Sequence, residues 1–598
     1  MDRRTFLATS GAAATALALP ATLKGAEPGG DAALDALFDR IFRDNIKESP
    51  EAITQLGFDK GPFAAVKSKL DDRSLDARAK ALARGKQAIA DITAINPQTL
   101  SKAGQLNREV VLYSLTSQTR GPEKFGVPST QRPYTLFQQG GAYFSVPDFL
   151  SSSHTVQNAA DAEAYLARLE AFGTALDQDS EVQRAEAAKG IVAPDFALEL
   201  TLGQLATLRK PAPEASSMAQ SLATRAKAAG AVGDWTARAA KIIADTVYPA
   251  LDRQIALVQG LPRRKEAGFW ALPNGAALYA DALSAATTTN FTPDEVHKLG
   301  REQVAEISAA LDTILRAQGL TKGSVGARLT ALNARPDQLY PDTAEGRATL
   351  IASLNEGVKA MQAKLPRDFL NPPSAPLEIR AVPVEIQDGA ANGYYRLAAL
   401  DGSRPAIYFI NLKSVGDWPK YTLPALTYHE GVPGHHTQLS IVAGLKTPLL
   451  RRFSFFSAYS EGWALYAEQL ADELGGYASP IERAGYLQSY LFRAARLVAD
   501  TGIHAKRWTR EQATDYFVDT VGFARPRSLR EIERYCTTAG QACSYKIGHI
   551  SWTRARAKAQ AILGKKFDLK QFHEVLRDGA VPLTILERLV EERARAAA

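Results

Sequence analysis

Apolar residues recur every three or four positions along most of residues 30–370. The segments DAALDALFDRIFRDNI (31–46) and AEAYLARLEAFGTALDQD (162–179) show this spacing clearly. It is the period at which one face of an α-helix becomes apolar and packs against its neighbours. The pattern therefore predicts a helical N-terminal region over residues 30–370.

The stretch TPDEVHKLGREQVAEISAALDTILRAQG (292–319) predicts both ends of one of these helices. Thr292 can act as the N-cap, Pro293 suits the first turn, and Glu295 completes a capping box. Gly319 is the type of residue that follows the last helical turn. We expect a helix between these two signals.

The pattern changes near residue 376, where β-branched and aromatic residues alternate with Gly, Asp and Pro. PLEIRAVPVEIQDG, ANGYYRLAAL and RPAIYFINL read as three short strands, the last over Ala406–Leu412. Such runs, separated by turn residues, are typical of a small antiparallel sheet. Helical spacing then returns and continues to residue 598. The fold class predicted is mainly α, with one small antiparallel β-sheet beside the helix that carries a histidine cluster.

The first 26 residues, MDRRTFLATSGAAATALALPATLKGA, do not fit the helical pattern. Arg3 and Arg4 precede Phe-Leu and a short run rich in Ala and Leu. This arrangement predicts a signal peptide over residues 1–26, of the twin-arginine type, and hence a periplasmic protein. No later segment has 18 uninterrupted apolar residues, so we expect no stable membrane insertion.

The amino-acid composition limits which classes of binding partner are expected. The 598 residues are 45% apolar and 23% charged, which is ordinary for a globular protein. The formal net charge is +7, but basic and acidic residues are intermixed, so no nucleic-acid partner is expected. Cys536 and Cys543 are the two cysteines. They form a disulfide only if the intervening segment turns, and two free buried thiols are the alternative. Nothing in the sequence indicates an oligomeric state.

Three of the eight histidines lie in the nonapeptide YHEGVPGHH (428–436). His429-Glu430 begins like the helical zinc motif H-E-x-x-H, but Pro433 occupies the place of the second histidine. On a regular helix His435 would lie about 240° around the axis from His429, on the wrong face. His436 would return to the same face but about 10.5 Å away along the axis, too far to share one metal ion.

The residues that break the short motif also permit another geometry. Pro433 removes a helical hydrogen bond, and Gly431 and Gly434 allow the backbone to leave helical angles. The segment can therefore bulge and bring His435 back toward His429. A third ligand is then expected from the following helix, SAYSEGWALYAEQLADE (457–473), which carries Glu461.

H-E-x-x-P-G-H-H followed by E-G-W resembles the signature of the bacterial domain-of-unknown-function 885 family. Segments 268–300, 401–412, 500–513 and 540–548 also resemble blocks of that family. The family is grouped with glutamate-zincin (gluzincin-type) metallopeptidases such as thimet oligopeptidase and carboxypeptidase Taq. The resemblance implies a multi-helix, zincin-like metallopeptidase fold, with residues 371–598 as the catalytic region of one continuous enzyme unit.

The resemblance also implies roles for individual residues. His429 and Glu461 would bind zinc together with His435, for which His436 is the alternative, and Glu430 would be the general base. Related zinc peptidases take an oxyanion donor from a later helix, which implies Tyr545 or His504 here. The strand Ala406–Leu412 resembles the edge strand that such enzymes pair with an extended peptide. We expect structural roles for the remaining histidines, which are His154, His297, His549 and His573.

The function expected is an exported zinc-dependent hydrolase of short peptides, with Glu430 as general base toward metal-activated water. Two alternatives remain open. One is a zinc hydrolase of a non-peptide amide or ester. The other is a metal-containing binding protein without turnover, against which the presence of Glu430 argues.

Overall fold

The structure is a computed structural model that describes residues 30–382, 387, 392–398 and 404–598. The predicted signal peptide lies outside these residues. Helices dominate the described chain, and three short strands form its one named sheet. The prediction of a mainly helical protein with a small sheet is confirmed.

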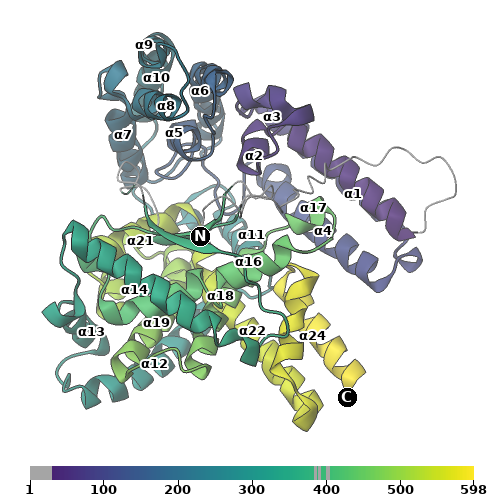
Figure 1. Cartoon of the computed structure of the whole chain (residues 1–598), viewed down its shortest axis with the longest axis vertical. Helices are drawn as coiled ribbons and strands as arrows, with labels where there is room; N and C mark the ends of the chain where they lie inside the picture. Colours follow the sequence, from purple (N-terminus) through teal and green to yellow (C-terminus); the bar gives the residue numbers. More distant parts are fainter. Residues whose placement is uncertain (1–29, 383–386, 388–391, 399–403) are drawn as a thin grey trace, which may run out of the picture.

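The region up to residue 370 is helical, as predicted, and α5 to α10 gather at one end of the molecule in Figure 1. Its helices are α1 (Gly30–Lys47), α2 (Pro50–Gln55), α3 (Leu75–Ala94), α4 (Lys102–Arg120), α5 (Ala142–Ser152), α6 (Ala159–Ala187), α7 (Asp195–Arg209), α8 (Ser217–Ala228), α9 (Trp235–Ile242), α10 (Tyr248–Gly260), α11 (Gly275–Thr287), α12 (Pro293–Ala317), α13 (Val325–Asn333) and α14 (Ala344–Gln362).

The predicted ends of α12 are confirmed. The Thr292 side chain accepts a hydrogen bond from the backbone N–H of Glu295, and the Glu295 carboxylate accepts one from the backbone N–H of Thr292. Gly319 follows the last turn with a φ of +77°, which only glycine adopts without strain.

The sheet consists of β1 (Leu377–Ala381), β2 (Gly393–Arg396) and β3 (Ala406–Ile410), in the order β1-β3-β2. β3 pairs parallel with β1 and antiparallel with β2. The prediction of a purely antiparallel sheet was therefore wrong, and so was the edge position predicted for the third strand. β3 is central and all five of its residues are buried. Strand periodicity reports which residues are extended but does not determine which strand each one pairs with.

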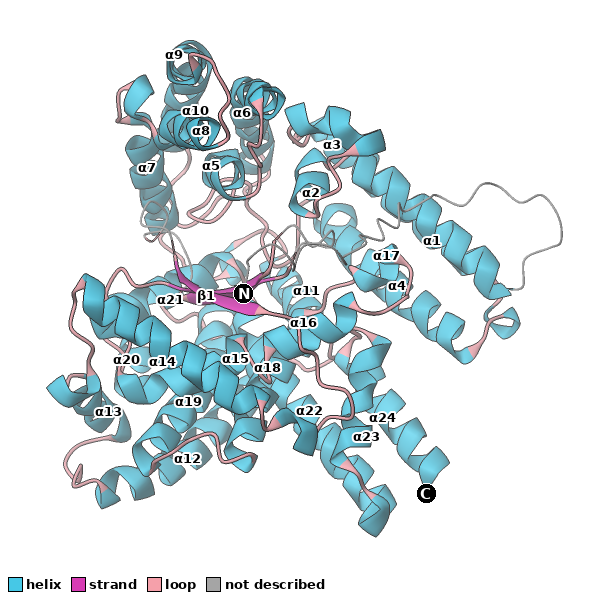
Figure 2. Ribbon diagram, viewed as in Figure 1, coloured by secondary structure: helices cyan, strands magenta, loops and turns pink. Residues whose placement is uncertain are grey.

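In the view of Figure 2 the sheet lies below α5 to α10 and above α14, α15 and α19. β2 packs against α15, the helix that carries His429, so the sheet is beside the motif as expected. The boundary predicted at residue 370/371 falls between α14 and β1 and stays a prediction. The helices that follow the sheet are α15 (Leu423–Glu430), α16 (His435–Ala443), α17 (Leu449–Arg452), α18 (Ser457–Glu473), α19 (Pro480–Ala505), α20 (Arg510–Val521), α21 (Arg525–Thr537), α22 (Gln541–Leu563), α23 (Leu569–His573) and α24 (Leu583–Ala597).

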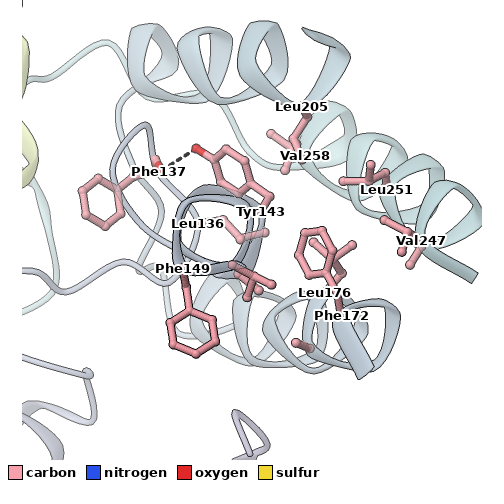
Figure 3. Close-up of a cluster of buried hydrophobic side chains, with 14 of the residues drawn as sticks. Leu136, Phe137, Tyr143, Phe149, Phe172, Leu176, Leu205, Val247, Leu251 and Val258 are labelled. Atoms are coloured by element: carbon pink, nitrogen blue, oxygen red, sulfur yellow. Dashed lines mark hydrogen bonds between the residues drawn. The ribbon is translucent and has the colours of Figure 1, made fainter. Parts of the chain in front are cut away.

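The N-terminal helices enclose an apolar core of their own. Phe172 and Leu176 of α6 meet Leu251 and Val258 of α10 in this cluster (Figure 3). The Tyr143 hydroxyl, at the edge of these apolar side chains, donates a hydrogen bond to the carbonyl of Phe137 at 2.7 Å. Burial of these apolar side chains stabilises the helices against one another.

Within the described chain, no helix combines the length and the apolar character that a membrane crossing requires. Cys536 and Cys543 are free thiols, both buried. Of the two possibilities left open by the sequence, the structure therefore has the unbridged one.

Candidate metal centre

The motif YHEGVPGHH forms a helix, a tight turn and a second helix. α15 ends at Glu430 and α16 begins at His435, so Gly431 to Gly434 leave the helical path, as predicted. The Val432–Pro433 peptide bond is cis. The turn brings the rings of His429 and His435 to a centroid distance of 5.0 Å, which a regular helix would not allow.

The turn is closed by a glycine and a tryptophan. A Cβ on Gly434 would lie 1.9 Å from the carbonyl oxygen of His429, so no other residue fits there. The Trp463 indole N–H lies 3.1 Å from the carbonyl of Pro433 and 3.2 Å from that of Gly434. Trp463 belongs to α18, which also carries Glu461, so one helix anchors the turn and supplies a further side chain to the site.

His429, His435 and Glu461 converge on one point. The Glu461 Oε2 atom lies 3.4 Å from Nε2 of His429 and 3.3 Å from Nε2 of His435. One ligand atom from each residue lies within 4.8 Å of the other two. This trio is the candidate metal centre of the described chain.

His436 points elsewhere. Its Nδ1 lies 3.2 Å from the Tyr395 hydroxyl and its Nε2 lies 2.9 Å from the carbonyl of Ala375. Both ring nitrogens therefore have partners outside the trio. The geometry favours His435 over the alternative His436 as the second histidine of the centre.

Glu468 orients the first histidine. Its Oε1 atom lies 2.9 Å from Nδ1 of His429, and its side chain is fully buried. A carboxylate on the far nitrogen of a histidine fixes the tautomer and directs the near nitrogen toward a metal. Sequence reasoning did not select Glu468, although it lies seven residues after Glu461 and thus on the same face of α18.

Hydrogen bonds within the site stabilise the charged forms of His429 and Glu461 although both side chains are largely buried. Burial lowers the pKa of His429, but its hydrogen bonds with Glu461 and Glu468 outweigh this and raise it to about 9. Burial raises the pKa of Glu461, yet the hydrogen bonds with His429 and His435 bring it well below its usual range. Without a metal, a proton on His429 thus supplies positive charge between the Glu461 and Glu468 carboxylates.

Glu430 and the trio open into one cavity of about 410 Å³. Burial raises the pKa of Glu430, while the neighbouring histidines oppose this increase. A carboxylate with a raised pKa beside a ligand cluster is suited to accepting and returning a proton. β2 contributes Tyr394 and Tyr395 to the wall of the same cavity.

Tyr545 also reaches the cavity. Its ring stacks on that of His429 at 6.2 Å, and burial, with a further contribution from Glu461, raises its pKa. α22 carries Tyr545 and crosses α18 very closely, since a Cβ on Gly462 would lie 2.4 Å from the Cα of Gly548. These two glycines allow the approach that places Tyr545 beside Glu461.

The structure does not bring His504 to the centre. Its Nδ1 accepts a hydrogen bond from the N–H of Phe269, and its Nε2 lies 3.0 Å from the carbonyl of Tyr535. Burial lowers its pKa to about 3. His504 does not line the cavity and has no free nitrogen, so the expectation that it acts as an oxyanion donor is corrected to a packing position.

The donor set fits a zinc ion. Two imidazole nitrogens and one carboxylate oxygen are zinc ligands, and three protein ligands with an open fourth position are the usual catalytic set. A tetrahedral ion with ligand bonds near 2.0 Å separates its ligand atoms by about 3.3 Å. The two distances from Glu461 are 3.4 and 3.3 Å. Each Nε2 atom thus lies at the distance from the Glu461 Oε2 atom that such an ion requires.

Comparison with known proteins confirms the resemblance to the DUF885 family. The family model described as "Bacterial protein of unknown function (DUF885)" matches residues 50–590, so the chain belongs to this family. No curated protein matches the chain.

Solved structures share the fold. A protein of Colwellia psychrerythraea, provisionally described as a lipoprotein, is 32% identical with a TM-score of 0.92, over 95% of this chain and 100% of its own. A protein of Shewanella oneidensis, provisionally described as a lipoprotein of unknown function, is 17% identical with a TM-score of 0.71, over 94% of this chain and 100% of its own. The second likeness shows the fold alone.

Proposed function

We propose that this DUF885 protein is an exported, zinc-dependent hydrolase of short peptides. The observation that carries the proposal is the convergence of His429, His435 and Glu461 beside the buried carboxyl of Glu430 in one cavity. A site that only bound metal would have no use for an additional buried carboxyl with a raised pKa.

His429, His435 and Glu461 would hold the ion, and Glu468 would orient His429. Zn²⁺ bound in this way acts as a Lewis acid and lowers the pKa of a water molecule. The proton that His429 holds without metal would leave when the ion binds, because a ligating imidazole must be neutral.

Glu430 would act as the general base. It would accept a proton from the attacking water and pass that proton to the leaving amine, which are the two transfers that amide hydrolysis requires. Its burial and raised pKa favour both, since a weakly basic carboxylate would not accept the proton. The Tyr545 hydroxyl, raised in pKa and therefore protonated at neutral pH, would donate to the developing oxyanion.

The cavity suits an extended peptide of a few residues. Its volume of about 410 Å³ lies within the range for small ligands and excludes a folded protein. Among the described residues β2 is an edge strand, and two of its tyrosines line the cavity. An extended backbone binds to such an edge by strand addition. The role that the sequence suggested for the third strand thus passes to β2.

Two further observations support the proposal. The residues His-Glu, Pro-Gly-His-His and Glu-Gly-Trp resemble the signature of the DUF885 family, which is grouped with glutamate-zincins, and the turn brings His429 close to His435. The leader predicted from Arg3-Arg4 supports export, and so does the description of the Colwellia psychrerythraea protein as a lipoprotein.

Metal analysis and peptide hydrolysis of the wild type and Glu430→Gln test the proposal together. We expect about one zinc per chain in both proteins, because Glu430 is outside the ligand set. Hydrolysis of a mixed peptide library should fall by about 100-fold or more in the variant, as for loss of a general base.

Three results would contradict it. Full turnover by Glu430→Gln would remove Glu430 from the mechanism, and absence of metal from both proteins would remove the site. Turnover of esters or non-peptide amides without turnover of any peptide would retain the proposal of a zinc hydrolase but contradict peptides as its substrate class.

A further inference from the structure

The cavity beside the candidate metal centre is lined by four arginines from two helices. Arg493 and Arg496 lie three residues apart on α19, and Arg527 and Arg534 lie seven apart on α21. Each spacing places both side chains of a pair on one helical face. Both faces are turned to the same cavity.

The cavity has fewer carboxylates available for pairing than it has guanidinium groups. Glu531 pairs with both Arg496 and Arg534, at 3.1 Å each. The other two lining carboxylates belong to Glu461, which contacts both histidines of the candidate metal centre, and to Glu430 beside that centre. A bound divalent cation would add further positive charge. Since a buried charge is costly without a partner, the cavity is incomplete without an anion.

Arg527 is the clearest unmatched group. Its guanidinium stacks on the ring of Phe523 at 3.7 Å, and its Nη1 donates to the carbonyl of Asp417 at 3.1 Å. In the part of the chain that the structure describes, no carboxylate lies within 4.0 Å of it. Its Nε atom is buried without a hydrogen-bond partner. An aromatic shelf beneath a partly unused guanidinium is a common arrangement for binding a carboxylate.

Arg493 connects this positive surface to the centre. Its Nη1 donates to the hydroxyl of Ser489 at 2.7 Å, and its Nη2 lies 4.0 Å from the Glu468 carboxylate that orients His429. The Arg496 guanidinium lies 4.3 Å from the ring centroid of Tyr545, which itself stacks on His429. An anion held by these arginines would therefore lie close to the reacting bond.

We infer that the substrate is a peptide whose free C-terminal carboxylate is bound by Arg527 and Arg493. The enzyme would accordingly remove one or a few residues from the C-terminal end. This inference rests on the proposed peptidase function and adds the end of the substrate that is recognised. An acidic side chain offers the same chemistry, and the experiment separates the two sources.

Three peptides of one sequence test the inference: one with a free C-terminus, one with a C-terminal amide, and one amidated after an added glutamate. We expect kcat/KM for the free acid to exceed that for the amide by about 100-fold, as for a charge-assisted pair at a buried site. Equal cleavage of acid and amide would overturn the inference. If the amidated glutamate peptide were cleaved as well as the free acid, recognition of the C-terminus in particular would be overturned.

Single substitutions test which arginine is responsible for the preference for a free C-terminal carboxylate. Arg527→Gln should abolish the preference for the free acid, mainly through a higher KM, and Arg527→Lys should restore part of it. Arg530→Gln is the matched control, because Arg530 lies on the same helix, is exposed, and does not line the cavity. An unchanged preference in Arg527→Gln would overturn the assignment of Arg527.

Binding to Glu430→Gln, measured by calorimetry, keeps this inference separate from the proposed function. The variant should bind the free acid more tightly than the amide by about 10-fold or more. If Glu430→Gln binds the free acid more tightly but the wild type hydrolyses no peptide, the proposed peptidase function is contradicted and the anion site is retained. Equal binding of the two peptides would overturn the anion site even if the wild type hydrolyses both.

Discussion

His429 and His504 are both buried almost completely, but their surroundings differ in kind. His504 lies between Phe269 and Tyr279, and backbone groups use both of its ring nitrogens. His429 bonds with one nitrogen to Glu468 and presents the other to Glu461 at the cavity. Burial therefore does not distinguish a packed histidine from a ligand. The distinguishing feature is a ring nitrogen that faces open space together with a second ligand.

His573 and His549 resemble His504 in that both of their ring nitrogens have partners within the protein. His573 lies between the carbonyl of Asp368 and the hydroxyl of Tyr466. His549 has Gln469 and Lys546 as partners of its two nitrogens. These contacts agree with the structural roles expected for His573 and His549. His429 and His435 differ from them because each has a ring nitrogen directed at Glu461 in the cavity.

Replacing a ligand should have the largest effect in this comparison. His435→Ala leaves two ligands of three, so zinc affinity should fall by more than the roughly 10–100-fold that loss of an outer partner costs. His436→Ala is the matched control and should retain zinc within a few-fold, because both of its nitrogens bond outside the trio. Zinc competition with a chelating dye measures both. Loss of zinc only in His436→Ala would exchange the two assignments.

Removing the packed histidine should affect stability and not metal. His504→Ala leaves the N–H of Phe269 and the carbonyl of Tyr535 unpaired and opens a cavity between two aromatic rings. We expect a loss of about 2–4 kcal/mol in the free energy of unfolding, measured by urea denaturation. His297→Ala, at a half-buried position, should cost about 1 kcal/mol. A loss of zinc by folded His504→Ala would remove the distinction between the two regions.

Weakening the orientation of His429 should have an intermediate effect. Glu468→Gln keeps the shape of the side chain but removes the charge that fixes the imidazole, so zinc affinity should fall by about 10–100-fold. Glu473→Gln, at the more exposed end of the same helix, is the control and should leave zinc affinity unchanged. Equal affinities of Glu468→Gln and wild type would show that the trio does not depend on this contact.

The smallest effect is that of pH on zinc binding. Without metal, hydrogen bonds with the two carboxylates raise the pKa of His429 to about 9. Protons therefore compete with zinc below that pH, and affinity should rise by at most about tenfold per pH unit from pH 7 to 9. A chelator titration at several pH values measures this slope. Affinity that is flat over this window would contradict the protonated state of His429.

Local patterns carried much of the prediction. The capping signals at Thr292 and Gly319 located a helix because caps depend on neighbouring residues alone. The three strands were found because alternation and turn residues are local as well. The bulge at Gly431 to Gly434 was inferred from the same kind of reasoning, since a proline and two glycines restrict what the backbone does nearby.

The errors concern contacts between distant segments. The sheet order depends on which strands meet across intervening loops, and no periodicity records that choice. His504 resembled a donor in sequence, but Phe269, more than 200 residues earlier, occupies its Nδ1. The sequence does not distinguish the arginines of α19 and α21 from ordinary surface charges. Only the packing of the two helices places all four side chains at one cavity.

The sequence by itself determined the helical class, the position of the sheet and a turn able to bring two histidines together. Those features follow from interactions within a few residues, which the order of amino acids states directly. Only the tertiary structure decided that His435 and not His436 meets Glu461, that β3 is central, and that four arginines share the cavity. Each of these depends on where separate elements come to rest, because burial and partner geometry are properties of the assembled packing.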